Sequence, residues 1–137
     1  MITGGSRGIG AACVRTFAEE GYAVVFLYHN SRDKAETLVQ SLRKEGQDVS
    51  AFQCDVADAA QVHAVIKEIL SMYRHIDVLV NCAGIAHIGL FADMTETEWD
   101  RLFAVNVRSA FSVTRSVLPG MISRQSGVIV NVISMWG

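Results

Sequence analysis

The stretch Thr3-Gly4-Gly5-Ser6-Arg7-Gly8-Ile9-Gly10 opens the chain and decides its fold. Apolar residues precede it and an apolar pattern at helical spacing follows it, so the glycines lie between an expected strand and an expected helix. Glycines at such a junction let the backbone turn sharply and approach a phosphate, while the first helical turn directs its N–H groups at the anion. The G-x-x-x-G-x-G spacing differs from the dinucleotide fingerprint G-x-G-x-x-G, so an ordinary glycine-rich turn remains an alternative.

Composition and charge limit the classes of function that we expect. The chain has 137 residues, of which 50% are hydrophobic, and this is enough for one core and one domain. Its net charge of −2 provides no basic surface, so we expect neither nucleic acid nor a membrane as a partner. There is no membrane-length apolar run and no signal peptide ahead of the glycine loop, and the three cysteines are widely spaced. We therefore expect a cytoplasmic protein with reduced thiols and no metal site.

Expected strands alternate with expected helices along the rest of the chain. Apolar, β-rich runs predict strands at 23–28, 49–54, 76–80 and 128–133, after a short strand at 1–2. Helical spacing predicts helices at 8–20, from a Ser31 cap to Gly46, from an Asp58 cap past Leu70, and from a Thr95 cap to about Ser123. Thr95 and Glu98 have the spacing of a capping box, and Pro119 is expected to kink the last helix near its end.

This alternation predicts an α/β fold, a doubly wound parallel sheet of the Rossmann-like type. Ligands of such sheets bind beyond the carboxyl ends of the strands, where the strand order reverses. The polar and glycine-rich segments of this chain fall at those ends: 4–10, 29–32, Asp55, 81–84 and Ser134. The sequence therefore predicts a ligand site at one edge of the sheet.

Several motifs taken together resemble the short-chain dehydrogenases/reductases. They are T-G-x-x-x-G-I-G at 3–10, Asp55-Val56, N-x-A-G at 81–84, V-N-V at 105–107 and S-x-x-G at 134–137. The resemblance covers the whole chain and is greatest to the 3-oxoacyl-acyl-carrier-protein reductases. Cys82 departs from the family's usual N-N-A-G.

The family's catalytic Tyr-x-x-x-Lys pair does not occur in these residues. In the family it lies about a dozen residues after the serine, whereas three residues follow Ser134 here. Tyr22, Tyr28 and Tyr73 occupy other places in the motif order. The first expected strand, at residues 1–2, also lacks its upstream part. We therefore expect residues 1–137 to be a partial dinucleotide-binding domain, the first half of a longer enzyme, and inactive alone.

The resemblance assigns cofactor contacts to residues at several strand ends. The glycine loop would contact the pyrophosphate, and Asp55 and Val56 the adenine, through a carboxylate and a backbone N–H. The turn at 81–84 would line the adenosine ribose and steady the central sheet. A solvated strand-end cap at Asp55 and a self-contained turn at Asn81 remain alternatives. The expected cofactor contacts in full are Gly4, Ser6, Arg7, Gly8, Ile9, Gly10, Tyr28, Asn30, Ser31, Arg32, Asp55, Val56, Asn81, Ala83 and Gly84.

The end of the second expected strand favours NADPH over NADH. Enzymes of this class that use NAD place an acid there to accept both ribose hydroxyls. Tyr28 holds this position, and none of the four residues after it is acidic. A 2′-phosphate would meet no repulsion and would pair with Arg7, and with Arg32 or the polar groups of Asn30 and Ser31. A solvated loop charge is the alternative for Arg7.

Two residues are expected to take part in the chemistry. The resemblance implies that Ser134 hydrogen-bonds the substrate carbonyl. It also implies that Asn106 kinks its helix and holds a water of the proton relay. An ordinary helix polar group is the alternative for Asn106.

The expected function is NADPH-dependent transfer of hydride to a ketone, with a 3-oxoacyl thioester on acyl-carrier protein as the substrate. One alternative is a reductase of the 5-aminopentanone group on elongation factor P, based on 89–91 and 134–137. Another is a non-catalytic nucleotide-binding half-domain. The resemblance implies a dimer or tetramer through the long helix that carries Trp99 and Phe103, with plain core packing as the alternative. His87 is expected near the substrate mouth, and the charged residues of 96–101 on a solvated face.

Overall fold

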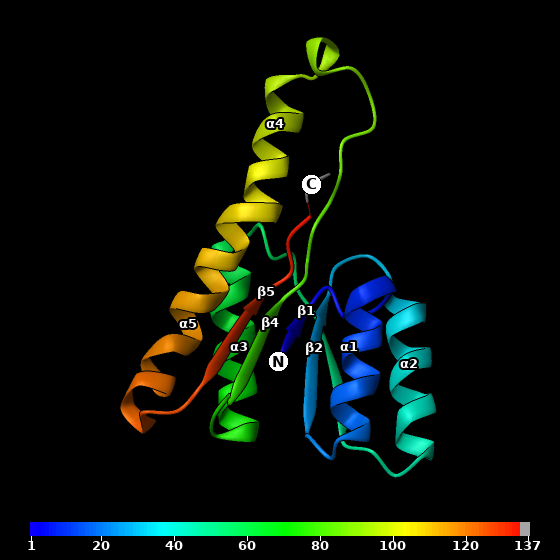
Figure 1. Ribbon diagram of the computed structural model, residues 1–137, viewed down its shortest axis with the longest axis vertical. Coiled ribbons are helices and arrows are strands. Elements are labelled where there is room, and N and C mark those ends of the chain that lie inside the picture. Colours follow the sequence, from blue (N-terminus) through cyan, green and yellow to red (C-terminus); the bar gives the residue numbers. More distant parts are fainter. Residues whose placement is uncertain (135–137) are drawn as a thin grey trace.

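A five-stranded parallel sheet with helices on both faces forms the protein, as predicted (Figure 1). The structure is a computed structural model that describes residues 1–134. The strands are β1 (Ile2–Thr3), β2 (Val24–Tyr28), β3 (Val49–Gln53), β4 (Val78–Asn81) and β5 (Val128–Asn131). The helices are α1 (Gly8–Glu19), α2 (Arg32–Lys44), α3 (Ala59–Tyr73), α4 (Glu96–Phe103) and α5 (Ser109–Arg124), with a 3-10 turn η1 (Phe91–Asp93) and a π-helical segment η2 (Ala104–Arg108).

The strand order is β3-β2-β1-β4-β5, so the order reverses between β1 and β4. β1 pairs with β2 on one side, through Ile2 and Phe26, and with β4 on the other, through Ile2 and Val80. The carboxyl ends of all five strands point to the same edge of the sheet (Figure 1). This edge at the reversal point is where ligands bind in doubly wound sheets.

Two apolar layers hold the sheet between its helices. Phe26 belongs to the layer that contains Val14 of α1 and Leu38 of α2, and its successor Leu27 belongs to the layer that contains Ile66 of α3. Phe26 and Leu27 are both 0% exposed. Neighbouring residues of a strand point to opposite faces, so β2 is covered on both, as its continuous apolar run predicts.

The helix ends agree with the predicted caps except at Ser31. The Asp58 carboxylate accepts hydrogen bonds from the Ala60 and Gln61 N–H groups at 2.9 and 3.2 Å, and Thr95 forms a reciprocal capping box with Glu98. Ser31 occupies the cap position of α2, but its side chain makes no capping hydrogen bond. The prediction is right that α2 begins after Ser31. It is wrong that the Ser31 side chain caps the helix, because this side chain accepts no hydrogen bond from the first turn.

The long helix expected over 95–123 is interrupted at Asn106, the residue at which the resemblance implies a kink. It consists of α4, then η2, then α5, and Pro119 lies inside α5. The π-helical turn inserts one extra residue per hydrogen-bonded loop and contains Asn106. The expected strand ends differ from the observed ones by at most two residues.

A line of apolar side chains stays exposed on the outer side of α4, η2 and α5, which we call the α4–α5 face. It comprises Trp99, Phe103, Val107, Phe111, Leu118 and Ile122. The Trp99 ring lies 4.6 Å from that of Phe103, centroid to centroid. Within residues 1–134, no helix combines the length and the apolar composition needed to cross a bilayer.

Candidate functional site

Close backbone contacts shape the glycine loop between β1 and α1. Gly4 has φ of +70°, and a Cβ on it would lie 2.9 Å from the Cα of Ala83. A Cβ on Gly10 would overlap the carbonyl oxygen of Gly4. Side chains at these two positions would therefore force α1 and the β4 turn away from the loop.

The start of α1 faces solvent at the carboxyl edge of the sheet. Arg7 precedes the helix in an extended conformation, its side chain does not cap the helix, and Gly8 has φ of +53° with open space around it. Arg7 and Ile9 are both exposed, and Ser6 is half-buried. The N–H groups of this first turn lack i−4 carbonyl partners within the helix, which makes the turn a ready anion site.

Thr3 joins the glycine loop to the turn after β4. Its Oγ1 accepts hydrogen bonds from the N–H groups of Cys82 and Ala83, both at 3.0 Å. Thr3 is buried, so these bonds satisfy donors that have little access to water. Sequence reasoning did not assign Thr3 this role, because a threonine at a strand end gives no sign of a partner about 80 residues away.

Asn81 ties the centre of the sheet to α5. Its Nδ2 donates to Thr114 Oγ1 at 3.2 Å and to Asn131 Oδ1 at 2.9 Å. Among the described residues, its buried Oδ1 has no hydrogen-bond partner. This agrees with the expectation that Asn81 steadies the sheet, and it places the Asn81 side chain in the interior rather than in a self-contained turn.

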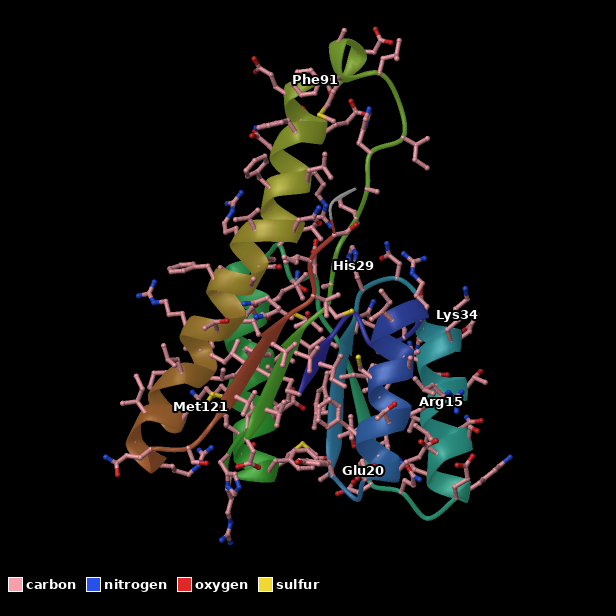
Figure 2. The ribbon with its side chains drawn as sticks, viewed as in Figure 1. Arg15, Glu20, His29, Lys34, Phe91 and Met121 are labelled. Carbon is pink, nitrogen blue, oxygen red and sulfur yellow. The ribbon has the colours of Figure 1, made fainter. Side chains whose placement is uncertain are left out.

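The end of β2 carries polar groups and no acid. Tyr28 is half-buried, and His29 and Asn30 are exposed. His29 lies at the carboxyl edge of the sheet (Figure 2). Arg32 Nε donates to Glu36 Oε1 at 2.7 Å, so a carboxylate already neutralises one of the two expected phosphate partners. Arg7 is the other.

Asp55, two residues beyond the end of β3, is held by an arginine from α4. Arg101 donates Nη1 to Oδ2 at 3.0 Å and Nη2 to Oδ1 at 3.2 Å, and Oδ1 also accepts the Ala57 N–H at 3.0 Å. His29 Nε2 lies 3.8 Å from Oδ2. Burial acts to raise the pKa of Asp55, but the hydrogen bonds and the positive charge of Arg101 outweigh it, and the pKa lies below its usual value.

Arg101 is exposed, as the prediction of a solvated charged face over 96–101 implies, but this prediction missed its ion pair with Asp55. The helical pattern of α4 assigned this arginine to the outside, and its side chain is indeed 42% exposed. Its partner Asp55 is 46 residues away in the sequence, and only the tertiary fold brings them together.

Asn106 fixes the loop after β4 against η2. Its Oδ1 accepts the Ile85 N–H and its Nδ2 donates to the Ile85 carbonyl, both at 2.8 Å. Gly84 lies next to this amide, since a Cβ on it would be 3.6 Å from Asn106 Oδ1. The π-helical segment therefore places the Asn106 side chain against the loop that follows β4.

Ser134 ends the described chain, beyond β5 on the same edge. The Val132 N–H donates to the Asn81 carbonyl at 2.9 Å, so the segment that leads to Ser134 runs beside the end of β4 (Figure 1). The rest of the S-x-x-G motif, at 135–137, lies outside the described residues. In the loop before α4, His87 Nδ1 lies 3.9 Å from Glu98 Oε1.

Solved structures of two oxidoreductases share this architecture. A metagenomic short-chain oxidoreductase in complex with NADP has a TM-score of 0.93 and 32% identity, over 98% of this chain and 61% of that one. An actinorhodin polyketide ketoreductase variant with NADPH has a TM-score of 0.90 and 31% identity, over 97% of this chain and 52% of that one.

Comparison of sequences also matches this chain to a reductase. The 3-oxoacyl-[acyl-carrier-protein] reductase FabG of Staphylococcus aureus strain Mu50 is 42% identical over 137 residues. The match spans 100% of this chain and 56% of that relative, so the chain covers little more than half of its length. The family model described as short chain dehydrogenase matches residues 1–137. The chain belongs to the short chain dehydrogenase family.

Proposed function

We propose that the whole protein is an NADPH-dependent reductase that transfers hydride to a ketone. The observation that carries this proposal is the close-packed glycine loop at the reversal point of the sheet, beside the exposed start of α1. Family membership supports the reaction class, and the similar structures with NADP and NADPH support the cofactor class.

The described residues fit a nicotinamide dinucleotide. Gly4 and Gly10 leave no room for side chains because the loop packs closely on its own backbone and on Ala83, whereas Gly8, at the start of α1, has open space around it. In our proposal, Gly4, Ser6, Gly8, Ile9 and Gly10 hold the pyrophosphate on the first turn of α1. The bound cofactor supplies the hydride.

The adenosine half is proposed to lie between the ends of β2, β3 and β4. The Asp55 carboxylate and the Val56 N–H meet the adenine, and Ala83 and Gly84 line the ribose. Asn81, at the end of β4 just before Ala83, is itself held by hydrogen bonds to Thr114 and Asn131. This part of the site needs an acceptor for the adenine amino group, and a carboxylate with a lowered pKa remains ionised at neutral pH.

NADPH is proposed over NADH because the end of β2 offers no carboxylate to repel a 2′-phosphate. Arg7, exposed at the start of α1, is the primary phosphate partner, with Tyr28, Asn30 and Ser31 beside it. Arg32 is assigned a smaller part than the sequence predicted, because Glu36 already pairs with it.

On the substrate side of the site, we propose roles for Ser134 and Asn106. Ser134 hydrogen-bonds the ketone oxygen and holds the carbonyl for hydride attack. Asn106 keeps the loop after β4 in place through Ile85. The 42% identity to the Staphylococcus aureus reductase favours a 3-oxoacyl thioester on acyl-carrier protein as the substrate.

A homodimer or tetramer is part of the same proposal. The α4–α5 face exposes six large apolar side chains, and exposed apolar patches are typical of protein interfaces. Self-association would remove this face from water.

An assay of NADPH consumption with an acetoacetyl thioester tests the proposed reaction. Ser134→Ala should lower kcat by about 10² or more, the scale of losing one oriented hydrogen-bond donor at a reacting carbonyl, and should leave NADPH affinity unchanged. Ser123→Ala, on the exposed end of α5, is the matched control. Activity of Ser134→Ala within a few-fold of the wild type would remove Ser134 from the site.

A further inference from the structure

The Asp55–Arg101 pair connects two parts of the molecule that the sequence does not relate. Asp55 follows β3 at the ligand edge, whereas Arg101 lies on α4, which extends beyond the sheet (Figure 1). The two hydrogen bonds of 3.0 and 3.2 Å form a bidentate guanidinium–carboxylate pair. Such a pair fixes the plane of the carboxylate as well as its position.

The hydrogen bonds of Asp55 leave one place for a ligand. An ionised carboxylate accepts about four hydrogen bonds. Within residues 1–134, Oδ1 accepts from Ala57 and Arg101, and Oδ2 accepts from Arg101. His29 Nε2 lies 3.8 Å from Oδ2, beyond hydrogen-bond distance. Oδ2 therefore keeps one acceptor position, on the atom nearer to His29.

Loss of Arg101 would leave the carboxylate held by one bond. The backbone of Asp55 is fixed independently, since its N–H donates to Gln61 Oε1 at 3.1 Å. The carboxylate itself would keep only the Ala57 N–H on Oδ1 and would be able to turn about its last side-chain torsion. Arg101 is thus the group that sets the direction of Oδ2.

We propose that Arg101 is a positioning residue for cofactor recognition, which holds Oδ2 of Asp55 toward the exocyclic amino group of the adenine. This inference rests on the proposed dinucleotide function and adds a residue from α4 to it. Arg101 acts through Asp55 and does not itself contact the cofactor. A purely structural role, in which the pair only anchors α4 to the sheet, is the competing explanation.

Comparison of adenine with hypoxanthine separates these two explanations. The hypoxanthine analogue of NADPH carries a carbonyl in place of the adenine amino group and has nothing there to donate to Oδ2. The wild type should bind NADPH on the order of tenfold more tightly than the analogue, the difference of one charge-assisted hydrogen bond. Arg101→Met should reduce this ratio of affinities by about fivefold or more, mainly because it weakens the binding of NADPH. A role in anchoring α4 alone would weaken both ligands equally.

Three further variants complete the test. Arg101→Lys keeps the positive charge but loses the bidentate guanidinium geometry. It should therefore show an intermediate ratio of affinities, even if Arg101→Met fails to fold. Asp55→Asn should reduce the ratio whether or not Arg101 is present, because both act on one contact. Arg15→Met, an exposed arginine on α1 (Figure 2), should keep the wild-type ratio.

The outcomes distinguish this inference from the proposed function. A wild-type ratio in both Arg101→Met and Arg101→Lys overturns the positioning role and leaves the dinucleotide function intact. A wild type that binds both ligands equally overturns the adenine contact of Asp55 and, with it, the positioning role. A wild type that binds neither ligand overturns the proposed function itself.

Discussion

At the scale of single residues, the cofactor choice depends on Tyr28. Tyr28→Asp places a carboxylate at the end of β2, where it would repel the 2′-phosphate of NADPH and accept the ribose hydroxyls of NADH. We expect the preference, measured as the ratio of kcat/KM values for the two cofactors, to move toward NADH. Tyr28→Phe is the control and should keep the NADPH preference. A wild-type protein that turns over NADH as well as NADPH would contradict this assignment.

Asp55 predicts a dependence of stability on pH. Its pKa is lowered in the folded state, so the ionised form stabilises the fold above the unfolded pKa, near pH 4, and this contribution disappears as the pH falls through the folded value. Chemical denaturation at several pH values should therefore show a loss of stability below about pH 4. Asp55→Asn should show a smaller loss over the same range. Equal losses in both proteins would mean that the pair adds nothing to the fold.

At the scale of elements, Thr3 connects β1 to the turn after β4. Thr3→Val keeps the shape of the side chain but removes the acceptor of two N–H groups, and each buried donor without a partner costs about 1–3 kcal/mol. We expect Thr3→Val to lower the free energy of unfolding by at least about 1 kcal/mol and to weaken NADPH binding, because the turn loosens. Thr3→Ser keeps the oxygen and should restore most of both. Unchanged binding in Thr3→Val would show that the turn does not need this contact.

The elements also show where sequence reasoning succeeds. The buried run of β2, the Asp58 cap and the capping box at Thr95 each follow from a local pattern, and each appears in the structure. The break in the long helix does not follow from the apolar periodicity and was indicated only by the resemblance at 105–107. The bonds that Asn106 makes there, to Ile85 at a separation of 21 residues, could not be predicted from the helix pattern.

At the scale of the whole molecule, one part of the candidate site could be predicted from sequence patterns and another part could not. The alternation of strands and helices placed its residues at one edge of the sheet, which the strand order confirms. The Arg101–Asp55 and Thr3–Ala83 contacts join segments separated by 46 and 80 residues, so they required the tertiary fold. The cofactor and substrate roles of these residues remain predictions.

A polypeptide limited to residues 1–137 is expected to be unstable. It exposes the α4–α5 face, and a cavity of about 170 Å³ lies at the amino end of the sheet, lined by Met1, Val24 and Val78 among others. The stability of a domain is only about 5–15 kcal/mol, so we expect aggregation or a broad thermal transition by circular dichroism. A cooperative transition that NADPH raises by several degrees would contradict this and favour a self-sufficient nucleotide-binding unit.

The central claim is that the glycine loop binds NADPH, and a fluorescence titration of the whole protein with NADPH tests it most directly. Gly10→Ala should raise the dissociation constant by about tenfold or more, because its Cβ would overlap the Gly4 carbonyl oxygen and distort the loop. Gly8→Ala is a milder variant that adds only backbone strain at the start of α1 and should also weaken binding. Gly120→Ala, inside α5, should bind like the wild type. Saturable binding that Gly10→Ala and Gly8→Ala weaken and Gly120→Ala keeps is the predicted result. No binding by the wild type, or equal binding by all four proteins, would contradict the claim.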